Sequence, residues 1–157
     1  MRVIDDLGEA KESETPVRVL VLEDDRVEQT KLARMLELAK MEPICAGSLI
    51  SARAALAEQE FDAAVIDVQL PDGSGLTMVP MLHGGERPCA CVVLTGSDDH
   101  GVVRQAVELG VTQFLRKPAS PHRVRQALSM ALHRSRTMRS WLDDGESVSE
   151  CEEVESR

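Results

Sequence analysis

The sequence predicts an α/β fold in which a doubly wound sheet of five parallel strands carries helices on both faces. Two observations lead to this prediction. Short apolar runs alternate five times with longer segments in which apolar residues recur at helical spacing. The runs are nearly continuous, as is typical of strands that are buried on both faces of a parallel sheet. Right-handed βαβ crossovers are then expected between successive strands.

The first two strand–helix pairs lie in the amino-terminal third of the chain. A strand is expected over 17–22, where an apolar run ends abruptly in Glu23-Asp24-Asp25. A helix is expected over 27–41, because one helical face carries Leu32, Met35, Leu36 and Ala39. A short strand over 43–46 and an Ala-rich helix over 51–59 follow.

The third unit begins with a strand over 63–66 that ends in Asp67. The segment 70–75 is rich in turn residues, and Ser74 is a candidate cap for a helix through Met81. The fourth strand, over 90–94, ends at Thr95. Asp98 or Asp99 is expected to cap a helix over 100–109 that Gly110 ends.

A fifth strand over 113–115 leads into Lys117-Pro118, and Ser120 with Pro121 opens the last helix. In a doubly wound sheet the ligand site lies at the carboxyl ends of the strands. The polar residues that follow these strands are therefore expected to come together. They are Glu23, Asp24, Asp67, Thr95 and Lys117.

The length of 157 residues suits one domain with additional sequence at its ends. The net charge of −9 lies mostly in those ends, since residues 1–16 contribute −3 and residues 135–157 contribute −4. We expect a flexible acidic leader over 1–16, the folded domain over 17–134, and a helix extension with a disordered acidic tail over 135–157. The charge balance argues against direct binding to nucleic acid or to an anionic membrane.

No apolar run approaches the roughly 20 residues that span a bilayer, and the first residues do not resemble a secretory signal, so a cytoplasmic location is expected. Cys89 and Cys91 share one strand face. They could form half of a Cys-x-Cys metal site, but small buried apolar residues are the favoured interpretation. The histidines have no paired spacing and are expected to face solvent: His83, His100, His122 and His133.

Four segments carry a family resemblance: Val-Leu-Glu-Asp-Asp at 21–25, Val-Ile-Asp-Val-Gln-Leu-Pro-Asp-Gly-Ser-Gly at 65–75, Val-Leu-Thr-Gly at 93–96 and Phe-Leu-Arg-Lys-Pro at 114–118. Together, in this order and after these strands, they resemble the receiver domain family of two-component response regulators. The resemblance covers about residues 17–134. It implies the CheY-like, flavodoxin-like strand order 2-1-3-4-5.

The resemblance also assigns roles to individual residues. Asp67 would be the phosphoacceptor, becoming a 4-aspartylphosphate, and Thr95 and Lys117 would assist the transfer. Glu23, Asp24, Asp67 and the backbone carbonyl of Gln69 would bind Mg²⁺. Thr95 and Phe114 would form the conformational switch, and the bond before Pro118 is expected to be cis. We further hypothesise that the inward rotamer of Phe114 is accessible before phosphorylation, because Phe lacks the hydroxyl of the frequent Tyr.

These residue types suit phosphoryl transfer on physical grounds. A carboxylate can attack phosphorus and form an acyl phosphate. Clustered carboxylates repel one another, and a hard cation such as Mg²⁺, which prefers oxygen ligands, relieves that repulsion. The transition state spreads negative charge over three equatorial oxygens, to which a cation, the Lys117 ammonium and the Thr95 hydroxyl could each be a partner.

The function implied is that of a response regulator receiver, which is not an enzyme acting on outside substrates. Its expected partners are a sensor histidine kinase or a histidine phosphotransfer protein, and a downstream protein effector; a homodimer is left open. A phosphohydrolase of the haloacid dehalogenase type is disfavoured, because it needs a second Asp where this chain has Gln69. A pseudo-receiver that is not phosphorylated, and a fragment of a longer regulator, remain alternatives.

Overall fold

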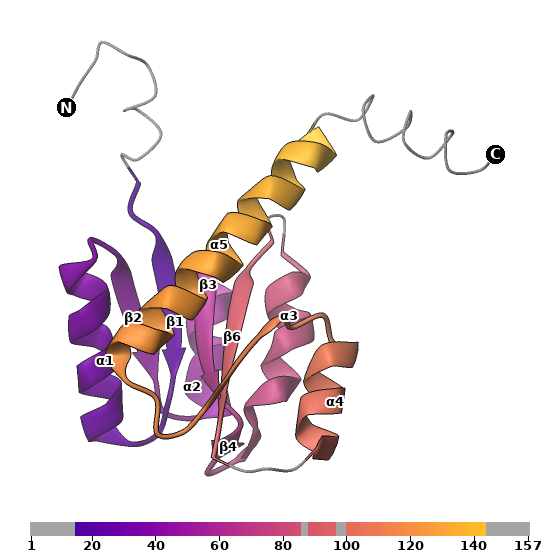
Figure 1. Cartoon of the computed structure of the whole chain (residues 1–157). Helices are drawn as coiled ribbons and strands as arrows, with labels where there is room; N and C mark the ends of the chain where they lie inside the picture. Colours follow the sequence, from indigo (N-terminus) through magenta and orange to yellow (C-terminus); the bar gives the residue numbers. More distant parts are fainter. Residues whose placement is uncertain (1–14, 86–87, 97–99, 144–157) are drawn as a thin grey trace.

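The computed structural model describes residues 15–85, 88–96 and 100–143 (Figure 1). Five strands form one parallel sheet: β1 (Arg18–Leu22), β2 (Glu42–Ala46), β3 (Ala63–Asp67), β6 (Ala90–Thr95) and β7 (Gln113–Arg116). Their order is β2-β1-β3-β6-β7, which is 2-1-3-4-5 when only these five strands are counted. The predicted fold class and strand order are therefore confirmed.

The described residues form five α-helices, of which the first four connect strands and the last follows β7: α1 (Arg26–Leu38), α2 (Leu49–Glu58), α3 (Val79–His83), α4 (His100–Glu108) and α5 (Pro121–Asp143). Helices α1 and α5 cover one face of the sheet, and α2, α3 and α4 cover the other (Figure 1). Alternate residues of each strand point to opposite faces, so Val19 and Val21 pack under α1 and α5 whereas Leu20 and Leu22 pack under α2 and α3. Every side chain of β1 after Arg18 is thus buried, as its continuous apolar run predicts.

Some boundaries differ from the sequence-based expectation. Helix α1 ends at Leu38 rather than at residue 41, because Lys40 has a left-handed backbone with φ of 67° and Glu42 already pairs with β1. Helix α2 begins at Leu49, two residues early, because Ser48 and Ser51 form a reciprocal capping box. The expected caps Asp98 and Asp99 lie outside the described residues.

The segment after β3 also differs from the expected turn-rich stretch over 70–75 and single helix through Met81. Two short antiparallel strands, β4 (Gln69–Leu70) and β5 (Gly73–Ser74), are followed by a 3₁₀-helix over Gly75–Met78 and then by α3. Ser74 does act as a cap, but it caps the 3₁₀-helix by accepting a hydrogen bond from Leu76 N–H. None of the described helices is long and apolar enough to cross a membrane.

Candidate functional site

Polar side chains meet at the carboxyl ends of the strands. Glu23 follows β1, Asp67 ends β3, and Thr95 ends β6. These three are the buried polar or charged residues of the described part of the chain, with exposed fractions of 1%, 4% and 7%. Because β1, β3 and β6 are adjacent in the sheet, their ends lie side by side, and the expected gathering of polar groups is present.

Three acids form the negative part of this site. Carboxylate oxygens of Glu23, Asp24 and Asp67 all lie within 4.8 Å of one another. Asp24 is exposed, whereas the other two acids are buried. Asp25, next along the chain, has a different role: its side chain accepts hydrogen bonds from Val27 N–H and Glu28 N–H and caps α1. The acidic triplet at 23–25 therefore divides into two site residues and one helix cap.

Lys117 is the positive part of the site. Its Nζ lies 3.0 Å from Oδ2 of Asp67, to which it donates a hydrogen bond, and 3.1 Å from Oε1 of Glu23. Burial lowers the pKa of Lys117, but its interactions with the carboxylates of Asp67 and Glu23 outweigh that effect, so its pKa is raised overall. The ammonium is thus held in its charged form between two buried carboxylates.

Glu23 keeps one oxygen without a hydrogen bond. Oε2 accepts a hydrogen bond from Asp25 N–H at 3.1 Å, whereas Oε1 is buried and has an ion pair with Lys117 at 3.1 Å but no hydrogen-bond partner among the described residues. Burial raises the pKa of the Glu23 carboxyl, against the hydrogen bonds that lower it. A buried oxygen in this state is suited to a further electropositive partner.

The acidic group is suited to a hard divalent cation as this partner. The donor set contains only oxygen atoms from three carboxylates, which is the chemistry that Mg²⁺ and Ca²⁺ prefer. Oε1 of Glu23, without a hydrogen bond, supplies an available lone pair beside the other two acids. The residues present therefore fit a metal ion of this class.

The backbone around Asp67 fixes the direction of its side chain. Oδ1 of Asp67 accepts a hydrogen bond from Gln69 N–H at 3.1 Å, while Oδ2 accepts from Lys117. The segment after β3 folds back so that Gly75 N–H donates to Val68 C=O at 2.8 Å. A Cβ atom at Gly75 would lie 2.1 Å from the backbone oxygen of Asp67, so only glycine allows this close approach.

Comparison with known proteins agrees with this geometry. The family model of the response regulator receiver domain matches residues 19–129. The chain belongs to this family. Its receiver domain is 33% identical over 110 residues to the photosynthetic apparatus regulatory protein RegA of Rhodovulum sulfidophilum, a match that covers 70% of this chain and 60% of RegA. It is 30% identical over 114 residues to a cyclic di-GMP phosphodiesterase of Thermotoga maritima, covering 73% of this chain and 30% of that protein.

The chain thus spans between 30% and 60% of the length of these two relatives. Among solved structures, a CheY-like receiver domain from Methanospirillum hungatei superposes with a TM-score of 0.74 at 19% identity, covering 79% of this chain and 99% of that one. This likeness concerns the fold. A response regulator from Burkholderia pseudomallei, solved with a phosphorylated aspartic acid, a calcium ion and citrate, has a TM-score of 0.67 at 26% identity, covering 78% and 72%.

The remaining expected residues of the receiver domain lie around the same edge. Thr95 is buried, and its backbone oxygen accepts a hydrogen bond from Lys117 N–H at 2.8 Å. Phe114 is half-buried on β7 and packs against the core under α2 and α3. The Lys117–Pro118 bond is cis, and the side chain of Gln69 is exposed.

Sequence reasoning missed two further contacts. Asp72, within the turn-rich segment, accepts hydrogen bonds from Leu49 N–H and Ile50 N–H at the start of α2. His83 is exposed as expected, but its Nε2 lies 3.9 Å from Sγ of Cys91. Neither pairing has a local signal, because the partners are 22 or 23 residues apart in the first case and lie on different elements in the second.

Proposed function

We propose that this receiver domain accepts a phosphoryl group on Asp67 from a phosphohistidine, with Mg²⁺ at the acidic group, and passes the signal to a partner protein. The observation that carries the proposal is the arrangement of Asp67, which ends a buried strand, has two acids beside it and is paired with Lys117 at 3.0 Å. A 26% identical response regulator solved with a phosphorylated aspartic acid supports the same chemistry.

The transfer exchanges one bond for another. A carboxylate oxygen of Asp67 attacks phosphorus, a P–O bond forms, and the P–N bond to the donor histidine breaks with its electron pair returning to the imidazole. The product is an acyl phosphate. Lys117 already contacts Oδ2 of Asp67, so its charge lies where negative charge accumulates on the phosphoryl oxygens.

Glu23, Asp24 and Asp67, together with the backbone carbonyl of Gln69, would hold the metal ion. When bound, Mg²⁺ supplies positive charge that offsets the carboxylates and the incoming phosphoryl group. The protein contributes the orientation of Asp67, through the hydrogen bond from Gln69 N–H, and the buried oxygen of Glu23. The sharing of Lys117 between Glu23 and Asp67 keeps the acids together.

The signal would leave through a change in packing. Thr95 and Phe114 lie on the neighbouring strands β6 and β7, where Phe114 pairs in register with Val93. A new phosphoryl oxygen near Thr95 would bias its hydroxyl toward the site, and the half-buried ring of Phe114 would move into the space that is left. The partners are then a histidine kinase or histidine phosphotransfer protein as donor and a protein effector as acceptor of the signal.

Acetyl phosphate, a small phosphoryl donor, tests the proposal without a cognate kinase. The full chain is incubated with acetyl phosphate and Mg²⁺, and its intact mass is measured. We expect the mass of one added phosphoryl group in the wild type and none in Asp67→Asn. Asp62→Asn is the matched control, because Asp62 lies at the opposite end of β3, and it should be phosphorylated like the wild type. An equal adduct in Asp67→Asn would place the acceptor elsewhere and reject the proposal.

A further inference from the structure

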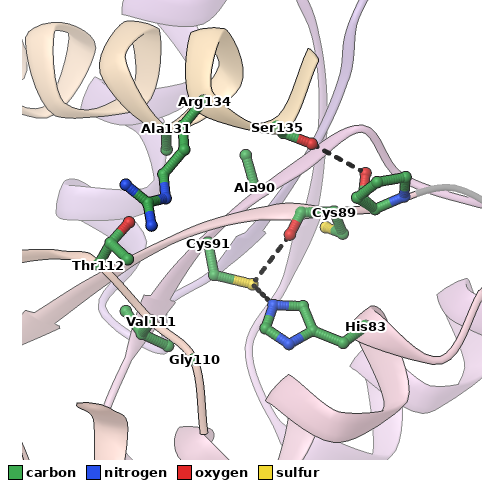
Figure 2. Close-up of a pocket in the computed structure, with 11 residues that line it drawn as sticks. His83, Cys89, Ala90, Cys91, Gly110, Val111, Thr112, Ala131, Arg134 and Ser135 are labelled. Atoms are coloured by element: carbon green, nitrogen blue, oxygen red, sulfur yellow. Dashed lines mark hydrogen bonds between the residues drawn. The ribbon is translucent and has the colours of Figure 1, made fainter. Parts of the chain in front are cut away.

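A pocket lies at the opposite end of the sheet from Asp67. It has a volume of about 350 Å³ and is lined by the start of β6 and the residues before it, the loop before β7, the end of α3 and the middle of α5 (Figure 2). The register explains its origin. Val92 is the first residue of β6 that pairs with β7, opposite Gln113, so Ala90 and Cys91 begin the strand before that neighbour starts. The edge of β6 is left open at this point.

Cys91 contributes a polarised thiol to this pocket. Its Sγ lies 3.9 Å from Nε2 of His83 and 3.8 Å from the backbone oxygen of Cys89. Cys91 is 5% exposed, and Figure 2 shows its sulfur and the His83 ring pointing toward one another. The ring also packs near the backbone of Gly110, where a Cβ atom would lie 3.6 Å from its Cε1. The His83 ring is therefore held between Cys91 and the backbone of Gly110.

Cys91 and His83 each favour the charged form of the other. Interactions with the Cys89 side chain and with His83 lower the pKa of Cys91, against its burial, which raises it. The hydrogen bond with Cys91 raises the pKa of His83. The pKa of Cys89 is raised instead, by its interaction with Cys91 and by burial. The thiolate, and not the thiol, is the nucleophilic form of cysteine, so this environment favours reactivity at Cys91 and not at Cys89.

A metal site is the rival use of these side chains. Within the described part of the chain, Cys89, Cys91 and His83 do not bring ligand atoms within 4.8 Å of one another, as the acidic group does. The Cys-x-Cys spacing therefore does not form a three-ligand metal cluster with His83. A strand spacing of two residues is also unfavourable for a disulfide between Cys89 and Cys91. With a metal site and a disulfide disfavoured, the contact between Cys91 and His83 supports covalent addition of a small molecule to the Cys91 sulfur.

We propose that Cys91 is a nucleophilic thiol that takes up small α,β-unsaturated carbonyl compounds in this pocket, with His83 as its proton partner. Nε2 of His83 accepts the thiol proton, and the sulfur attacks the β carbon of the electrophile. The π electrons move onto the α carbon and carbonyl oxygen, and His83 returns the proton to the α carbon. The product is a thioether and a neutral imidazole, so the reaction needs no oxidant or second substrate.

The pocket lining suggests this ligand class. Its volume lies at the lower end of the range of about 300–1,000 Å³ for small-molecule pockets. Ala90, Val111 and Ala131 supply apolar wall, and the guanidinium of Arg134 lies on the pocket side next to Thr112 (Figure 2). A conjugated carbonyl matches this combination, because its carbon chain suits the apolar wall and its oxygen accepts hydrogen bonds from Arg134.

N-ethylmaleimide, a small unsaturated imide, tests the proposal on the full folded chain. The rate of modification of each cysteine is measured from the masses of its peptides after digestion. Cys45 is the internal control, because the residue is exposed and its pKa is raised, by partial desolvation of the thiol and by the charge of Glu37. We expect Cys91 to react faster than Cys45 although it is far less exposed. Reaction of Cys91 only after denaturation, or no faster than Cys45, would overturn the proposal.

Two variants test the roles of His83 and Arg134 separately. In His83→Leu, a change at an exposed residue, Cys91 should react roughly tenfold more slowly, the effect of one pKa unit on the thiolate fraction, while Cys45 is unchanged. Arg134→Gln should slow the maleimide but not methyl methanethiosulfonate, which has no conjugated carbonyl. An unchanged Cys91 rate in His83→Leu would reject the proton partner, and equal effects of Arg134→Gln on both reagents would reject the carbonyl class. Circular dichroism of each variant verifies its fold.

Discussion

Gly75 controls the position of Asp67, the proposed phosphoacceptor, more directly than its distance along the chain suggests. Its backbone passes so close to β3 that an added Cβ would lie 2.1 Å from the backbone oxygen of Asp67 and 2.7 Å from Cγ2 of Ile66. Neither atom is the end of a flexible exposed side chain, so the methyl group can be accommodated only if the backbone of β3 or of the loop moves. The site depends on the direction of Asp67, and that movement would change it.

Gly75→Ala should therefore reduce both stability and phosphorylation. We expect a loss of about 1–3 kcal/mol in the free energy of unfolding, as is typical when a methyl group is forced into a packed region. Urea unfolding measures the loss, and acetyl phosphate labelling below the transition measures the effect on Asp67. Gly47→Ala is the matched control, since its nearest neighbour would be 3.9 Å away. Wild-type labelling by Gly75→Ala would show that the close approach is unimportant for Asp67.

At this scale the sequence predicts which residues gather but not how each is used. Glu23, Asp24, Asp67, Thr95 and Lys117 could be anticipated because each follows or ends a parallel strand. That Asp25 caps α1 while Glu23 is buried is decided by the direction in which the chain leaves β1, which no residue type encodes. The contact between His83 and Cys91 depends on the packing of α3 against β6 and is likewise not local.

Asp72 connects two elements that are separate in the sequence. Its carboxylate oxygens accept hydrogen bonds from Leu49 N–H at 2.9 Å and from Ile50 N–H at 3.2 Å, so it caps the first turn of α2 from the β4–β5 turn. The hydrogen bond from Leu49 N–H is the main reason that the pKa of Asp72 lies below its usual value. The cap attaches the loop that carries Gln69 to a helix of the core.

The lowered pKa of Asp72 gives a pH-dependent prediction. A carboxyl group whose pKa is lower in the folded state stabilises the fold above its unfolded value of 3.8, and this contribution is lost as the pH falls through the folded pKa. Asp72→Asn should therefore be less stable than the wild type at pH 7, and this difference in stability should shrink below pH 3.8 and close as the pH falls through the folded pKa. The midpoints of urea unfolding at several pH values measure this difference in stability. Glu60→Gln, an exposed acid after α2, should show no such gap, and a gap for Asp72→Asn that is independent of pH would contradict the ionic cap.

Element boundaries were predictable where a residue type sets them and not elsewhere. Gly110 ends the region of α4 with a positive φ of 94°, and Ser120 caps α5 by accepting a hydrogen bond from Arg123 N–H, as expected. The pair β4–β5 was not predicted, because strands of two residues carry no apolar period. Helix α1 ends early because pairing of Glu42 with β1 competes with helix formation, which is a tertiary effect.

The strand order places three acids together at one edge of the sheet. The order β2-β1-β3-β6-β7 makes the ends of β1 and β3 neighbours, so three carboxylates are held within 4.8 Å of one another, and Lys117 contacts two of them. Two of these acids are buried, where their repulsion is poorly screened. The fold therefore tolerates an electrostatic cost that a bound cation would remove, and the stability of the protein is expected to depend on the metal.

Unfolding with and without Mg²⁺ tests this dependence, and Asp24 makes the test specific. A ligand that binds only the folded state stabilises it by about 2.7 kcal/mol at a hundred times its dissociation constant. We expect Mg²⁺ to raise the melting temperature of the wild type and of Asp62→Asn, but not of Asp24→Asn. Without Mg²⁺, Asp24→Asn should be more stable than the wild type. The substitution removes one of the three repelling charges, and the exposed side chain of Asp24 leaves no cavity. If Asp24→Asn were less stable than the wild type both with and without the metal, Asp24 would be acting as an ordinary structural residue and the acidic group would not be a cation site.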